Sequence, residues 1–167
     1  LFGAAATSGS GLVVLAPSNA NCVGRVDASA LSFTCLVLVP RCADNSDHLF
    51  FSAAATPSGE VVFGPLHADA VCVYSDLGPS VSCVDISSTL TMDYKFAGAA
   101  ASSSGVVVFS PRNADCFGEF DPATSTFECH DVTSELSMDG TGKFYGGVAA
   151  PDGRILMPPG NTDCVGI

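Results

Sequence analysis

Short apolar runs bounded by polar turns recur along the chain and set its period. Each run follows a glycine and is closed by a proline six residues after that glycine. The four glycines are Gly11, Gly59, Gly105 and Gly153, with spacings of 48, 46 and 48 residues. Self-similarity at such a period is the signature of a repeat protein. We predict one repeat domain over residues 1–167, with units 1–48, 49–94, 95–142 and a partial unit 143–167.

The third unit shows the expected elements most clearly. It contains four short apolar segments separated by turn residues, and Asp121 to Ser125 has the Asp-Pro chemistry of a tight turn. No segment has a 3.6-residue period long enough to predict a helix with confidence. The strands that we predict in this unit are 96–101, 106–110, 116–120 and 126–132. The fold class is therefore all-β, with four antiparallel strands in each complete unit.

Four strands in about 47 residues is the period of a β-propeller blade. The first strand of a blade lines the central channel, where glycine and alanine permit close approach of backbones. The second strand lies between neighbouring blades, which suits a continuous apolar run. We expect one aromatic at the same place in every blade: Phe2, Phe50, Phe96 and Phe144. We expect burial between blades for the second-strand residues Val14, Val62, Val108 and Leu156.

Two segments carry a resemblance to known propeller repeats. Residues 144–155 resemble the opening of blades in the broad NHL, kelch-like and streptogramin-lyase-like group, and Asp121 to Thr124 resembles the hairpin turn of such blades. The resemblance implies a propeller-type array of about 3.5 blades and no single activity. The chain has no Trp, so the WD dipeptide is missing. An open β-solenoid and a sandwich are the alternative folds.

Three and a half blades do not close a ring, because propellers have four to eight. Exposed blade faces and strand edges are then expected at both ends of the array. We expect a fragment of a longer chain first, association with other copies second and an open array third. The partners implied are other blades, besides a protein or small polar ligand.

Composition and charge exclude several classes of protein. With 47% hydrophobic and 14% charged residues, the chain is not a disordered tail. Seventeen acidic against six basic residues give a net charge of −11, which argues against nucleic acid and anionic membranes as partners. No run of 18 apolar residues occurs, so we expect no membrane span. A soluble protein is expected, and its compartment is left open.

Eight cysteines make the chain cysteine-rich, and none of them forms a CxxC motif. A two- or four-residue hairpin turn places Cys72 directly opposite Cys83, which makes this pair a possible disulfide. The same register leaves two other pairs one diagonal step apart, about 7–8 Å, which is too far for easy bridging. These are Cys22 with Cys35 and Cys116 with Cys129. We therefore interpret most cysteines as small buried apolar side chains; Cys42 has no counterpart in other units.

A polar loop follows each proline of the repeat and supplies the candidate site. Its residues would share a face with the loops that link one blade to the next. The candidates are Asn19, Asn21, His67, Asp69, Asn113, Asp115, Asn161 and Asp163. A ring of such side chains could hold a polar ligand or a cation such as calcium. The alternative is that they only bond their own backbone in Asx turns. The loops that link the blades are acidic. They are either ordinary solvated loops or an acidic patch that binds a basic partner.

Support for catalysis is thin. The sequence contains no nucleophile elbow, phosphate loop or dinucleotide fingerprint. Its histidines, His48, His67 and His130, occupy non-equivalent repeat positions, and we assign no catalytic residue. The leading hypothesis is a non-catalytic binding or scaffold propeller that uses its loop face. The alternatives are a propeller enzyme of the lyase or lactonase kind, and a disulfide-stiffened extracellular module.

Overall fold

The computed structural model describes residues 1–37, 47–134 and 140–167. The described residues form three four-stranded antiparallel sheets and one two-stranded sheet, without an α-helix. We call these sheets blades 1 to 4. Blade 1 contains β1 (Phe2–Thr7), β2 (Val13–Pro17), β3 (Cys22–Asp27) and β4 (Ser32–Val37). Blade 2 contains β5 (Phe50–Ala55), β6 (Val61–Pro65), β7 (Ala70–Ser75) and β8 (Ser80–Asp85). Blade 3 contains β9 (Phe96–Ala101), β10 (Val107–Pro111), β11 (Cys116–Asp121) and β12 (Thr126–Asp131). Blade 4 contains β13 (Val148–Ala149) and β14 (Ile155–Leu156).

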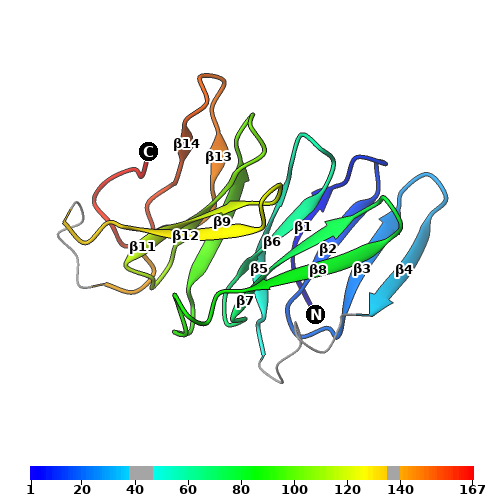
Figure 1. Ribbon diagram of the computed structural model, residues 1–167, viewed down its shortest axis with the longest axis horizontal. Coiled ribbons are helices and arrows are strands. Elements are labelled where there is room, and N and C mark those ends of the chain that lie inside the picture. The colour runs from blue at the N-terminus through cyan, green and yellow to red at the C-terminus, as the bar shows by residue number, and fades with distance from the viewer. Residues whose placement is uncertain (38–46, 135–139) are drawn as a thin grey trace.

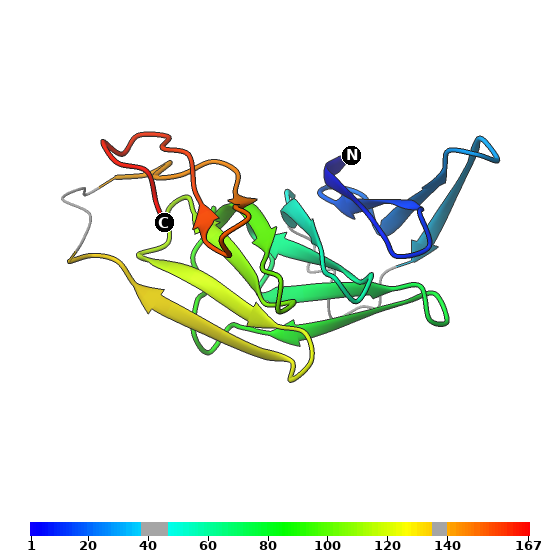
Figure 2. The same cartoon turned by 90° about the horizontal axis from the view of Figure 1, so that it is seen from above.

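The blades lie side by side in chain order, from blade 1 at the N-terminus to blade 4 at the C-terminus (Figure 1). The first strand of each blade contacts the first strand of the next, as β1 does with β5 and β5 with β9 (Figure 2). Small residues permit this approach: a Cβ added to Gly3 would collide with the Phe50 carbonyl, and one added to Gly98 with Gly146. The four-stranded antiparallel blades of the sequence analysis are confirmed.

The repeated glycine has a conformational cause. Gly11, Gly59, Gly105 and Gly153 end the turn between the first two strands with φ of 85, 91, 96 and 90°. A side chain at such a φ meets its own backbone, so glycine is the residue that fits at least cost. The turn places the second strand antiparallel to the first, as in the pairing of Ala100 with Val108.

Three apolar cores lie between successive blades. The first joins Val14 and Val23 of blade 1 to Phe50 and Phe63 of blade 2. The second joins blade 2 to blade 3 around Phe96 and Phe109, and a smaller third core joins blade 3 to blade 4. Strand β6 is buried along its whole length, as expected of a strand with a blade on each side.

Of the four second-strand residues predicted to be buried between blades, two are buried. Val14 and Val62 are fully buried, whereas Val108 and Leu156 are only partly buried. All four occupy equivalent register positions, opposite Ala6, Ala54, Ala100 and Val148. Val108 faces blade 4, which covers it incompletely because that sheet has two short strands.

Blade 1 exposes a face whose counterparts in blades 2 and 3 are buried. Phe2 is only partly buried, whereas its counterparts Phe50 and Phe96 have no exposed surface. Phe2 contacts Phe33 edge-on, and Phe33 is 55% exposed. Leu15 lies against Gly24 on the same face and is also only partly buried. An apolar blade face without a neighbour is what an incomplete array leaves at its end.

Each complete blade has a disulfide across its outer hairpin, which corrects the interpretation of the cysteines. Cys72 pairs with Cys83 as predicted, and the two bridges thought too long also form, Cys22–Cys35 and Cys116–Cys129. The predicted register was right: Gly24 lies opposite Cys35, and Gly118 opposite Cys129. However, strand twist shortens one diagonal of a hairpin. The Cα atoms of the diagonal pairs are therefore 5.6 and 5.4 Å apart, within the range of disulfides.

Candidate functional site

The loops between second and third strands are attached by their backbones to the start of the following blade. The carbonyl of the first loop residue accepts a hydrogen bond from a backbone amide at the start of the next blade. This bond recurs as Leu49 to Ser18, Lys95 to Leu66 and Lys143 to Arg112, at 3.0, 2.9 and 2.8 Å. The loops and the links between blades therefore share one face, as predicted. We call it the loop face.

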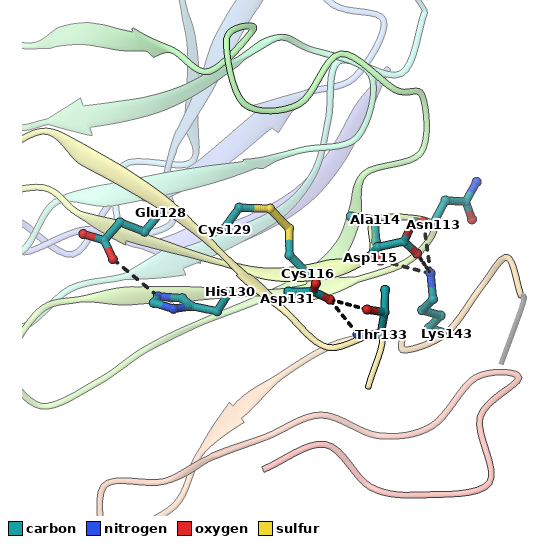
Figure 3. The surroundings of a disulfide bond; sticks show 10 residues. All are labelled: Asn113, Ala114, Asp115, Cys116, Glu128, Cys129, His130, Asp131, Thr133 and Lys143. Carbon is teal, nitrogen blue, oxygen red and sulfur yellow. Dashed lines mark hydrogen bonds and ion pairs between the residues drawn. A yellow bond between two sulfur atoms is a disulfide. The ribbon is translucent and has the colours of Figure 1, made fainter. Parts of the chain in front are cut away.

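Two predicted ligand residues, Asp69 and Asp115, are already paired with buried lysines. Lys95 Nζ donates to Asp69 at 2.8 Å and to the His67 carbonyl at 3.1 Å. Lys143 Nζ donates to Asp115 at 3.0 Å and to two loop carbonyls (Figure 3). Lys95 is fully buried and Lys143 is 4% exposed. Each carboxylate thus neutralises a lysine of the next blade, which leaves it a poorer ligand for a cation.

The sequence has an aspartate in the loop at each blade boundary where the next blade begins with a lysine. These loop aspartates are Asp69 and Asp115. At the first boundary the loop residue is Asn21, and the equivalent of the lysine is the buried residue Leu49. A neutral residue thus replaces the acid where the base is missing, as a buried ion pair requires.

The predicted asparagines bond to the links between blades. Asn19 donates to Asp47 at 2.8 Å, Asn113 accepts from the Gly142 amide at 3.1 Å, and Asn161 donates to the Thr141 carbonyl at 2.7 Å. These bonds are neither Asx turns nor ligand contacts. They fix the loops to the segments that precede the first strands.

Asn21 and Asp163 are exposed, and within the described ranges neither makes a side-chain hydrogen bond. No group of three or more His, Cys, Asp or Glu side chains in the described ranges is close enough to hold a metal ion. Among the described residues, Asp69 and Asp115 are thus paired with lysines and Asn19, Asn113 and Asn161 with the links between blades, and a ligand role for these candidates stays a prediction. Cys42 and parts of the two linking loops, residues 43–46 and 137–139, lie outside the described residues.

The structure assembles a different group on the loop face, which sequence analysis missed except for His67. His48 lies 5.9 Å from His67 between ring centres, and His67 lies 4.4 Å from Tyr94. The Arg112 guanidinium lies 4.4 Å from the Tyr94 ring and 5.8 Å from the Tyr145 ring. We call these five residues the ring row. It crosses the starts of blades 2, 3 and 4 as a continuous series of planar groups.

Two members of the ring row are held in an unusual backbone conformation. His48 and Tyr94 directly precede the Leu49 and Lys95 positions and have φ of 64 and 56°. The equivalent residue of blade 4 is Gly142, with φ of 75°. Glycine is the low-cost residue at this φ, and bulky side chains there are uncommon. Such outliers cluster at functional sites, so the presence of two rings at this position makes the loop face a candidate site.

The ring row is accessible. Tyr94 and Tyr145 are 38% and 42% exposed, and His48 is exposed as well. The Nε2 atom of His67 is buried and has no hydrogen-bond partner, while Nδ1 of His48 lies 3.3 Å from the Ser18 hydroxyl. Alignment of the repeats could have signalled His48 and Tyr94, because both replace a glycine of another unit. Nothing in the repeat signals Arg112 or Tyr145.

The third histidine lies elsewhere. His130 is on β12, stacks on Phe117 at 4.7 Å and lies 3.4 and 3.7 Å from carboxylates of Glu119 and Glu128. Figure 3 shows it beside Glu128 on the strand that carries Cys129. It belongs to the outer hairpin of blade 3 and contributes nothing to the loop face.

The fold defines a β-propeller-type array, and comparison with solved structures agrees. The chain resembles a histidine-to-alanine variant of virginiamycin B lyase from Staphylococcus aureus, described as catalytically inactive and solved with quinupristin, at a TM-score of 0.73 and 14% identity. It also resembles a streptogramin B lyase and the WD40 repeats of RRP9, with TM-scores of 0.71 and 0.67 and identities of 13% and 8%.

The matches cover 98%, 93% and 93% of this chain but only 50%, 47% and 44% of the chains of the variant lyase, the streptogramin B lyase and RRP9, respectively. The chain thus spans about half the length of these propellers. At such identities the likeness shows the fold alone, and both enzymes and repeat proteins share it. No protein-family model matches the sequence, and no curated protein matches it either. No helix in the described segments is long and apolar enough to cross a membrane.

Proposed function

We propose that this chain is a ligand-binding propeller module whose site is the ring row on the loop face. One observation carries the proposal: His48 and Tyr94 place rings at a backbone conformation that Gly142 adopts at less cost in the equivalent place. Accessible Tyr94 and Tyr145 rings offer apolar area with few rotatable bonds, which favours binding. The predicted acidic and amide residues support the loops beneath the row.

The proposal includes an oxidising, extracellular-type compartment. Three outer hairpins each carry a disulfide, and such bonds persist mainly outside the reducing cytosol. The hypothesis of a disulfide-stiffened module thus joins that of a binding module. The exposed Phe2 and Phe33 face of blade 1 supports another blade as a partner, from a longer chain or a second copy.

The test uses Tyr94→Gly, which removes a ring of the row while giving the backbone the residue that suits its φ. Wild type and variant are screened by thermal shift against a panel of small carboxylic acids, amines, sugars and short peptides. The matched control is Leu31→Gly, a second residue with positive φ, which lies in the hairpin of blade 1. We expect compounds that stabilise wild type and the control, and that no longer stabilise Tyr94→Gly.

The proposal is wrong if every stabilising compound acts equally on Tyr94→Gly and wild type. A panel without any stabilising compound would also count against a small-ligand site. Circular dichroism confirms beforehand that both variants keep the all-β fold.

A second candidate function is a propeller lyase, and one observation favours it. The ring centres of His48 and His67 lie 5.9 Å apart, so two imidazoles, the side chains that most often act as general acids and bases, meet on the loop face. A histidine-to-alanine variant of the similar lyase is described as catalytically inactive. The test is chromatography of quinupristin incubated with wild type, His48→Gln and His67→Gln. Conversion by wild type alone would support this candidate, and unchanged quinupristin in all samples would contradict it.

A further inference from the structure

Two basic residues of the described ranges, Arg112 and Arg25, form no ion pair with a carboxylate, and both lie over tyrosine rings. Lys95, Lys143 and Arg154 each form an ion pair with an aspartate. The Arg112 guanidinium contacts the rings of Tyr94 and Tyr145, and no carboxylate within the described ranges forms an ion pair with it. Arg25 lies 5.9 Å from the ring of the fully buried Tyr74, whereas Arg112 lies over the accessible rings of Tyr94 and Tyr145 on the loop face. Arg112 is therefore the unpaired arginine that a ligand on this face would meet.

Contacts with the two rings constrain what Arg112 can bind. Ring contacts use the flat faces of a guanidinium, while its N–H donors point outward in its plane. A fork of parallel N–H groups matches the two oxygens of a carboxylate. We propose that Arg112 binds the carboxylate of a small ligand whose aromatic or apolar part lies against Tyr94 and Tyr145. This inference rests on the proposed function of the ring row.

The charge of the chain selects among anions. The net charge of −11 repels a polyanion, whose many charges all feel the field of the protein within about one Debye length. A ligand with a single carboxylate is repelled much less, and its contact with Arg112 offsets that repulsion. The half-exposed Tyr94 and Tyr145 rings supply the apolar contact that a simple inorganic anion would not use. A monocarboxylate with an aromatic group satisfies both conditions.

The experiment compares two probes that differ in one group. N-acetyl-phenylalanine carries the carboxylate, and N-acetyl-phenylalaninamide has the same ring without charge. Both are titrated into ¹⁵N-labelled protein at pH 7 while the Nε–H resonance of Arg112 is followed. We expect the acid to bind at least tenfold more tightly than the amide and to shift the Arg112 resonance. We expect Arg112→Met to abolish the preference and Arg112→Lys to retain part of it.

Equal affinity of the two probes for wild type would overturn the inference, and that comparison needs no variant to fold. A preference for the acid that persists in Arg112→Met would overturn it too. If neither probe binds while other compounds still act through Tyr94, the carboxylate inference fails and the proposed function stands. If binding of the acid is unchanged in Tyr94→Gly, the proposed function fails.

Discussion

The ammonium group of Lys95 is buried between blades 2 and 3 and donates a 2.8 Å hydrogen bond to Asp69 of the preceding blade. Lys143 and Asp115 repeat this arrangement one boundary later. The two carboxylates remain 43% and 74% exposed, so water solvates the acids while the bases are enclosed. Removal of the acid should therefore matter more than removal of the base.

The first prediction copies the neutral first boundary, Asn21 and Leu49, onto the second. Asp69→Asn leaves the buried Lys95 ammonium without its carboxylate and should cost about 2 kcal/mol of unfolding free energy. Lys95→Leu removes the buried charge, so its cost should be below about 1 kcal/mol. The double variant should be no less stable than Lys95→Leu alone. Urea unfolding of all four proteins gives the coupling between the residues.

Additive effects in that cycle would contradict the pairing. The corresponding exchange at the third boundary, Asp115→Asn with Lys143→Leu, is the internal replicate. There the loss from Asp115→Asn should be smaller, because Asp115 is more exposed and Lys143 keeps two carbonyl acceptors.

The second prediction concerns pH. Burial opposes ionisation of Asp76, but hydrogen bonds from Ser8, Tyr74 and Ser10 outweigh it and lower the pKa of Asp76 to about 2 from an ordinary 3.8. The folded protein then holds this proton more weakly than the unfolded chain. The resulting stability is complete above the unfolded value and is lost as pH falls toward 2.

Solvent screening limits that contribution to about 1 kcal/mol. Asp76→Asn should therefore be less stable than wild type at pH 6, and the difference should vanish near pH 2. Unfolding by urea across this range measures the difference. A gap of the same size at both ends would show that ionisation of Asp76 does not matter.

The third prediction concerns the diagonal disulfides. Cys116→Ala with Cys129→Ala opens a loop with a sequence separation of 13 and should cost about 3 kcal/mol. Cys164 is an exposed free thiol, so Cys164→Ser is the matched control and should leave stability unchanged. Peptide mapping without reduction should recover Cys116 linked to Cys129. Recovery of alkylated Cys116 from folded protein would refute the bridge.

The fourth prediction is a gain in stability. Leu31 is 90% exposed and is the last residue of the hairpin turn of blade 1, with φ of 49°, and Ser125 holds the same position in blade 3 with φ of 56°. The hairpin of blade 2 places its positive φ of 74° one position earlier, at Gly78. Leu31→Gly should relieve backbone strain and raise stability by about 0.5–1 kcal/mol. A thermal midpoint below that of wild type would contradict this explanation. Gly78→Leu should show the opposite sign.

The blades could be predicted from the sequence because each blade needs the same residue types at the same places, and these recur at a fixed period. Gly59 and Gly105 recur because one turn needs their φ. The turn at Asp121 to Ser125 indicates the hairpin register of blade 3, and the same register in blade 2 places Cys72 opposite Cys83. The bridge from Cys116 to Cys129 was missed because an idealised flat hairpin omits twist. Twist shortens the distance between the Cα atoms of these diagonal residues by about 2 Å relative to a flat hairpin.

The candidate residues chosen from the repeat lie on the loop face, and their role as ligand residues stays a prediction. Repetition pointed to Asp69 and Asp115, but repetition marks what the fold needs, and both support the next blade. Residues that depart from the repeat form the ring row instead. His48 and Tyr94 stand where Gly142 would suffice, and Arg112 reaches Tyr145 across a blade boundary that a linear pattern does not show.

The most direct test of the central claim follows the tyrosines during binding. The chain has three: Tyr94 and Tyr145 lie in the ring row, and Tyr74 is fully buried between blades 1 and 2. Aromatic ¹H–¹³C spectra are recorded while a stabilising compound from the panel is added to wild type. We expect saturable shifts of the Tyr94 and Tyr145 ring signals with Tyr74 unchanged. Saturable binding that leaves both Tyr94 and Tyr145 unmoved would contradict a ligand site on the ring row.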